Sequence, residues 1–190
     1  LGINASTAMY IAAAIIVAYT FLGGFSAVCW TDFFQGLLML AALLIAPIFA
    51  LGLVNAGKGA ETAAQLPAGY WSLMTNWKDI ISGLGWGLGY FGMPHIIVRF
   101  MAVRSDHELR KSAKIGIVWN ILIIAFSVAA GCIGHLLLGE ISDSSTVFIQ
   151  MVRLIFPGVI SGILLSAILA ASMSTADSQL LASASASSSD

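Results

Sequence analysis

Residues 83–95 read GLGWGLGYFGMPH, which sets five glycines and one proline in the middle of an apolar stretch. In a helix interior each glycine is about 1 kcal/mol less favourable than alanine, and proline about 3 kcal/mol less favourable. In lipid an unsatisfied backbone group costs several kcal/mol, so irregular backbone persists only where protein buries it or where it lines a cavity. The stretch therefore predicts a discontinuous helix with a structural reason for its break.

The same glycines have a second interpretation. Small residues repeated at spacing four let two membrane helices pack closely. In this stretch the glycines recur at spacing two from residue 83 to residue 89, which favours a broken helix over a packing surface. Discontinuous helices of this kind form the midplane binding sites of secondary transporters, where freed carbonyls and half-helix ends meet ions and polar solutes.

The composition is that of a membrane protein. The 190 residues are 59% hydrophobic and 9% charged, whereas a soluble domain is about 25% charged. A net charge of −1 without a long basic run excludes nucleic acid as a partner, because phosphate neutralisation needs clustered Lys and Arg. We expect an all-α membrane protein whose main environment is the lipid bilayer. Because the sequence begins with Leu1, we also expect it to be a piece of a longer protein.

Apolar runs of about 20 residues can each cross a bilayer. Five such runs predict transmembrane helices at residues 9–28, 34–54, 80–98, 115–138 and 159–181. Residues 29–33 predict a tight connection between the first two. The loop 99–114 carries five basic residues against two acids, which predicts that it is cytoplasmic. Loops 55–79 and 139–158 are then external, and the apolar spacing of residues 147–155 predicts a short amphipathic helix on the outer surface.

The broken segment carries candidate solute-binding residues. Trp86 and Tyr90 are four residues apart, so a locally helical stretch sets both on one face, with Pro94 one turn further on. Aromatic rings offer an apolar wall with a polar handle, which suits a small zwitterion that has an apolar ring. A packing role for these aromatics is the alternative.

The last run carries candidate cation ligands. Ala171, Ser174, Thr175 and Ser178 stand at i, i+3, i+4 and i+7, which is one stripe of a helix. Their carbonyl and hydroxyl oxygens are ligands that a hard cation such as sodium accepts. The alternative is that each hydroxyl bonds to the carbonyl four residues before it.

Asp177 lies off this stripe. An acid inside a membrane span costs about 2.5 to 3.5 kcal/mol on insertion scales and faces the protein interior or a watery path. We interpret Asp177 as a residue of a sodium release path and not as a primary ligand.

Two stretches carry a family resemblance. Residues 85–101, GWGLGYFGMPHIIVRFM, and residues 166–181, SAILAASMSTADSQLL, resemble signature sequences of the sodium:solute symporter family. The first is most similar to the sodium/proline symporters of that family. Residues 8–14 and 19–25 match the same family, and the resemblance extends along essentially the whole sequence.

The resemblance implies a LeuT-like fold of two five-helix inverted repeats, of which this sequence holds the end of the first repeat and three helices of the second. It implies a non-enzymatic, multi-pass protein of the plasma or inner membrane that couples sodium entry to L-proline uptake by alternating access. Sodium is then the coupling ion, with no other cofactor. By the same resemblance, the family's proline pocket and sodium ligands correspond to two sets of residues in this sequence. The first is Trp86, Tyr90 and Pro94, and the second is Ala171, Ser174 and Thr175.

Alternative functions stay open. Met93 stands where other family members carry Gln, so pantothenate, another amino acid or a sugar is an alternative solute. A sensor or channel built on the same fold is a further alternative. An intramembrane Ser/His hydrolase is disfavoured, because the spacing provides no nucleophile elbow and no oriented third partner.

Overall fold

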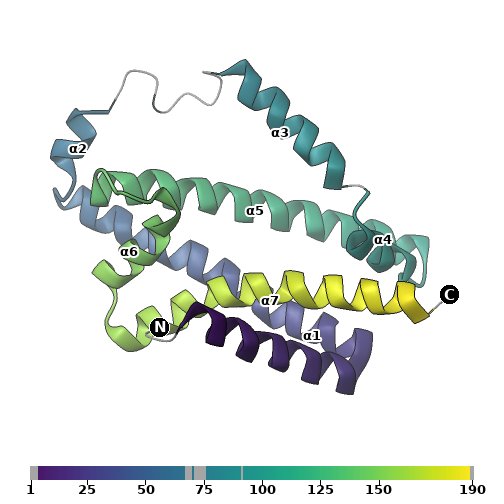
Figure 1. Cartoon of the computed structure of the whole chain (residues 1–190). Coiled ribbons are helices and arrows are strands. Elements are labelled where there is room, and N and C mark those ends of the chain that lie inside the picture. Colours follow the sequence, from purple (N-terminus) through teal and green to yellow (C-terminus); the bar gives the residue numbers. More distant parts are fainter. Residues whose placement is uncertain (1–3, 67–69, 71–75, 91, 189–190) are drawn as a thin grey trace. The chain divides into compact units, whose positions relative to one another are not determined.

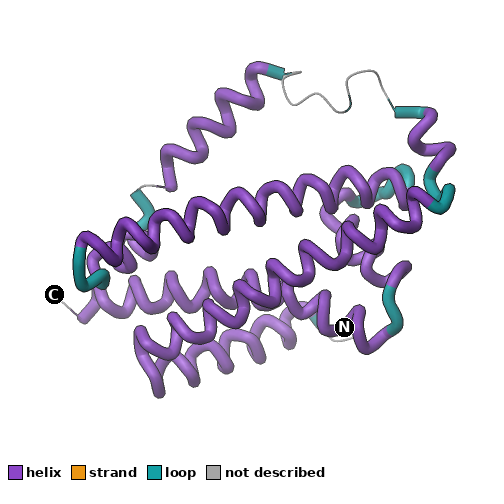
Figure 2. The backbone as a smooth tube through the Cα atoms, turned by 180° about the vertical axis from the view of Figure 1, so that it is seen from behind, coloured by secondary structure: helices purple, strands orange, loops and turns teal. Residues whose placement is uncertain are grey.

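The structure is a computed structural model that describes residues 4–66, 70, 76–90 and 92–188. Within these ranges every regular element is a helix (Figure 2), which confirms the all-α prediction. The elements are α1 (Ala5–Asn55), α2 (Ala60–Ala64), α3 (Trp77–Tyr90), α4 (Pro94–Met101), α5 (Asp106–Leu138), the short 3-10 helix η1 (Ser144–Thr146), α6 (Val147–Ile155) and α7 (Gly158–Ser188).

Three of the described helices, α1, α5 and α7, are long and apolar enough to cross a membrane. At a rise of 1.5 Å per residue the 51 residues of α1 make about 75 Å of helix in total, enough for two crossings of a hydrocarbon core of roughly 30 Å. The expected span 80–98 is divided between α3 and α4, and neither part is long enough to cross alone. The prediction of five spans stays a prediction.

A sharp break divides α1 at Gly24, where φ is 54° and ψ is −147°. Figure 1 shows α1 as two arms that meet at a bend. A side chain would strain this left-handed backbone, so glycine permits the turn. The expected connection at residues 29–33 was therefore wrong, since these residues are helical. The polar side chain of Thr31 is accommodated within the helix, because its hydroxyl bonds to the backbone carbonyls of the preceding turn. The distances are 3.0 Å to Ala27 and 2.9 Å to Val28.

The chain forms two compact units, and each is described by itself. The terminal unit comprises Leu1–Ala42 and Gly162–Asp190, and the central unit comprises Leu43–Ser161. In the terminal unit α1 contributes the buried side chains of Ile16 and Val28. The core side of α7 presents a ladder of small or compact apolar side chains, Leu164, Ala167 and Ala170. The small side chains of Ala167 and Ala170 let membrane helices approach closely.

The central unit is built on the C-terminal end of α5. The expected amphipathic helix at residues 147–155 is present as α6, whose Met151 and Val152 are fully buried. Ser161 closes the end of α6, because its hydroxyl donates to the Phe156 carbonyl at 2.8 Å. Before α6, the Asp143 carboxylate caps η1 by accepting from the Ser145 amide at 3.0 Å. It also accepts from the Ser145 hydroxyl at 2.7 Å, and these two bonds hold the pKa of the Asp143 carboxyl below its usual value.

Gly134 lets α6 seat against α5. A Cβ at this position would overlap Cγ1 of Val147, which is the first residue of α6. Val147 is β-branched and has few alternative rotamers, so it cannot swing aside readily. The approach of the two helices therefore depends on the absence of a side chain at Gly134.

We expect Gly134→Ala to lower the stability of the full-length protein. Overpacking lowers the free energy of unfolding by about 1 to 3 kcal/mol, whereas the better helix propensity of alanine raises it by at most about 1 kcal/mol. Gly131→Ala is the matched control on the same helix, because its methyl group would meet nothing within 4 Å. Thermal unfolding of the purified protein in detergent should give a lower midpoint for Gly134→Ala than for Gly131→Ala. Equal midpoints would contradict the proposed contact.

Candidate functional site

The break that the sequence predicts lies between α3 and α4. The amide of Gly92 donates to the Gly89 carbonyl at 3.2 Å, and the amide of Met93 donates to the Tyr90 carbonyl at 3.3 Å. These bonds span three residues, whereas α-helical bonds span four, so the α-helical pattern stops here. Pro94 then begins α4, the helix position where a missing N–H is best tolerated. The local sequence thus ends one helix and starts the next.

The glycines of α3 have empty space at the position that a Cβ atom would occupy. A Cβ on Gly83, Gly85, Gly87 or Gly89 would meet no described atom within 4 Å. No described residue of α3 is buried. Within the described chain these four glycines therefore do not serve close packing, and all four lie inside the continuous helix α3, which ends at Tyr90.

The two candidate aromatics of the broken segment lie together on α3. The ring centroids of Trp86 and Tyr90 are 4.7 Å apart with an angle of 59° between the ring planes. Trp86 is 70% exposed and Tyr90 is 42% exposed. Pro94 is exposed in the first turn of α4, after the break. The pair presents an open aromatic surface beside the broken backbone, which can receive an apolar ring.

The candidate sodium ligands lie on α7 in the terminal unit. The hydroxyl of Thr175 donates to the Ala171 carbonyl at 3.1 Å, so two candidate ligand oxygens are adjacent. Both residues are exposed and Ser174 is half-buried. This is the back-bonded arrangement that the sequence left open for these hydroxyls. The hydroxyl oxygen of Thr175 keeps its lone pairs when it donates, so it can still coordinate a cation.

Asp177 is fully buried in the terminal unit and has two hydrogen-bond donors. The Tyr19 hydroxyl of α1 donates to Oδ2 at 2.5 Å. The Ser178 hydroxyl contacts Oδ1 at 3.3 Å and the Ser174 carbonyl at 2.8 Å. A buried carboxylate is stable only when it is hydrogen-bonded, and the Tyr19 hydroxyl provides the shorter of these two contacts, because the single proton of Ser178 is shared with the Ser174 carbonyl. The bonds also connect Asp177 to Ser174, a candidate sodium ligand.

Tyr19 is the site residue that sequence reasoning did not identify. It stands in an apolar run and is 158 positions from Asp177 along the chain. Its polar group was the one available signal, because a tyrosine hydroxyl in a buried setting usually has a partner. Thr20 Oγ1 and Gln35 Oε1 of α1 are also buried polar atoms, and neither has a hydrogen-bond partner in the described part of the chain. The terminal unit therefore has a polar interior.

The comparisons with known proteins agree with the resemblance that the motifs suggested. The family model described as "Sodium:solute symporter family" matches residues 1–190. The chain is 42% identical to the "High-affinity proline transporter PutP" of Bacillus subtilis strain 168, over 97% of this chain and 41% of that protein. It is 41% identical to the "Sodium/proline symporter" of Escherichia coli K12, over 97% of this chain and 39% of that protein.

The chain thus spans about two fifths of the length of these relatives. No solved structure matches it. Because the family model covers every residue and the relatives align along 97% of the chain, the assignment does not depend on one motif. The chain belongs to the sodium:solute symporter family.

Proposed function

We propose that the protein containing this chain couples sodium entry to the uptake of L-proline across the plasma or inner membrane. The observation that carries the proposal is 41–42% identity, over 97% of the chain, to proteins named as proline transporters. The break between α3 and α4 and the oxygen stripe of α7 support it, because they are the features that a midplane solute site and a cation site need. The LeuT-like arrangement of two inverted repeats is part of the proposal.

In this mechanism Trp86, Tyr90 and Pro94 form one wall of the proline pocket. The two exposed rings on α3 stack against the pyrrolidine ring. Carbonyls released from α-helical bonding at the break receive the ammonium group of the substrate. The open glycine positions leave the backbone accessible to a small solute.

Sodium is held in the same mechanism by the Ala171 carbonyl and the hydroxyls of Ser174 and Thr175. A cation can shift the equilibrium between outward-open and inward-open states only through its different affinity for the two. Sodium and proline each favour the state that the other prefers, and this reciprocity couples their transport. Asp177 then receives the cation on its way out by offering a carboxylate oxygen in exchange for the first ligands, since Ser178 contacts both this carboxylate and the Ser174 carbonyl.

Uptake of labelled proline by the full-length protein in vesicles tests the function. We expect accumulation against a proline gradient when an inward sodium gradient is imposed, and none when the gradient is absent. Unlabelled proline should compete, and pantothenate, sugars and other amino acids should not. Concentrative uptake without a sodium gradient, or competition by another solute in place of proline, would contradict the proposal.

Removal of the Thr175 hydroxyl tests the cation ligands. Loss of an oxygen ligand worth about 1.4 kcal/mol raises the sodium concentration for half-maximal uptake about tenfold. We expect this for Thr175→Ala, with normal membrane insertion. Ser172→Ala is the matched control, because Ser172 is also back-bonded on α7, to Ile168, but lies off the stripe. If both variants keep the wild-type sodium dependence, Thr175 is not a ligand.

Truncation of Trp86 tests the solute pocket. An aromatic contact is worth about 0.5 to 1.5 kcal/mol beyond its buried area, so Trp86→Ala should raise KM for proline about two- to tenfold while the sodium dependence changes less. Trp77→Ala is the control, since Trp77 is exposed at the opposite end of the same helix. Equal loss of sodium and proline affinity would indicate a packing role for Trp86.

Tyr19→Phe tests the contact that satisfies Asp177. A hydrogen bond to a charged group contributes about 1.5 to 3 kcal/mol, so this variant should be less stable by that order. A double-mutant cycle with Asp177→Asn should give a coupling energy, because the two side chains touch. Tyr10→Phe is the control, as Tyr10 is exposed on the same helix. Additive effects of Tyr19→Phe and Asp177→Asn would exclude a direct interaction.

A further inference from the structure

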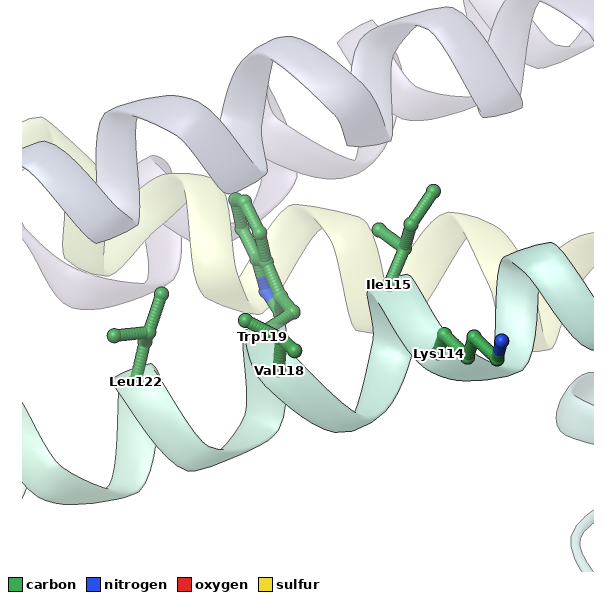
Figure 3. A pocket seen from close by; sticks show the side chains of 5 residues that line it. All are labelled: Lys114, Ile115, Val118, Trp119 and Leu122. Carbon is green, nitrogen blue, oxygen red and sulfur yellow. The ribbon is translucent and has the colours of Figure 1, made fainter.

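An open groove lies along one face of α5 near its N-terminal end (Figure 3). It has a volume of about 320 Å³. The residues that line it are Lys114, Ile115, Val118, Trp119 and Leu122. Lys114, Val118 and Leu122 stand at i, i+4 and i+8 of the helix, and Ile115 and Trp119 each follow one of them, so the five residues share one face. The lining is almost entirely apolar, because Lys114 contributes its aliphatic stem at one end and the other residues are aliphatic or aromatic.

The sequence of α5 predicts that the groove spans the level at which a bilayer changes from headgroups to hydrocarbon. α5 has 33 residues and is about 50 Å long, so it exceeds a hydrocarbon core of roughly 30 Å. Residues 106–114 hold the charged residues of α5, and the apolar sequence begins at Ile115. Trp119 stands just inside this boundary, and tryptophan is enriched at that depth in membrane proteins. We therefore expect Lys114 at headgroup level, and Val118 and Leu122 at the level of the first acyl carbons.

Positive charge accumulates at the same end of the groove. Arg110 and Lys111 stand four and three residues before Lys114, so the three cations lie on neighbouring positions of one helix surface. All three are exposed. Residues 99–114 contain five of the eight Lys and Arg residues of the chain. An anion at the membrane surface is attracted to this end, and such clusters are typical of sites for anionic lipid headgroups.

We propose that this groove binds an anionic phospholipid of the leaflet into which residues 99–114 project. The phosphate of the lipid pairs with the Lys114 ammonium group, and Arg110 and Lys111 add to the local positive potential. One acyl chain lies along Ile115, Val118 and Leu122, with the Trp119 ring as a side wall. The aliphatic floor favours a lipid over a soluble phosphate, because a soluble anion leaves that surface unfilled. This site is separate from the proposed transport function and does not depend on it.

Quenching of Trp119 fluorescence in the full-length protein tests the site. The protein is reconstituted in phosphatidylcholine vesicles that contain either brominated phosphatidylglycerol or brominated phosphatidylcholine at the same mole fraction. The Trp119 signal is the difference between the wild type and Trp119→Phe. We expect the anionic lipid to quench this signal at a lower mole fraction than the zwitterionic lipid.

Substitutions of Lys114 test whether its ammonium group contacts the lipid phosphate. Removal of one basic residue near an anionic surface should reduce the preference for the anionic lipid about fivefold, which we expect for Lys114→Gln. Lys114→Arg should keep the preference, because the charge is retained. Lys58→Gln is the control, since Lys58 is exposed and outside the groove.

Four results would overturn the proposal. Equal quenching by both lipids would exclude selectivity for an anionic headgroup. Absence of quenching by either lipid would mean that protein covers the groove. An unchanged preference in Lys114→Gln would remove the proposed contact. Loss of the preference on addition of inorganic phosphate would indicate a soluble anion as the occupant.

Discussion

The need to satisfy backbone hydrogen bonds in lipid governs this chain more than any single side-chain contact. An apolar solvent offers no partner to a free amide or carbonyl, so continuous helices are the default. α1, α5 and α7 follow that default over most of their length. The chain departs from it at Gly24 and between Tyr90 and Pro94, where glycine or proline makes the departure possible. Each departure redirects the chain or releases backbone groups, which is how an all-helical protein creates polar surface inside a membrane.

The terminal unit must also satisfy a buried ionisable side chain, in addition to its backbone groups. Asp177 is fully buried, and the Tyr19 hydroxyl meets it at 2.5 Å. Ser178 contacts both the carboxylate and the Ser174 carbonyl. A buried carboxylate with such hydrogen-bond partners can be held inside the protein at a tolerable free energy.

Local physical effects explain which features the sequence could predict. Helix breaking by Gly and Pro acts over a few residues, so residues 83–95 predicted the break that the structure has between α3 and α4. The turn in the first apolar run was misplaced at residues 29–33, because hydropathy runs unbroken through Gly24 and backbone conformation decides the turn. The partnership of Tyr19 with Asp177 could not be predicted, because it depends on two helices far apart in the chain. The resemblance, and not the spacing, supplied the assignment of the α7 oxygens to sodium.

The most direct measurement is a structure of the full-length protein determined with sodium and L-proline bound. We expect a cation within coordination distance of the Ala171 carbonyl and the Thr175 hydroxyl, and a solute against Trp86 and Tyr90 beside a helix broken before Pro94. A continuous helix through residues 80–98, with the Thr175 hydroxyl facing lipid and no cation beside it, would contradict the account.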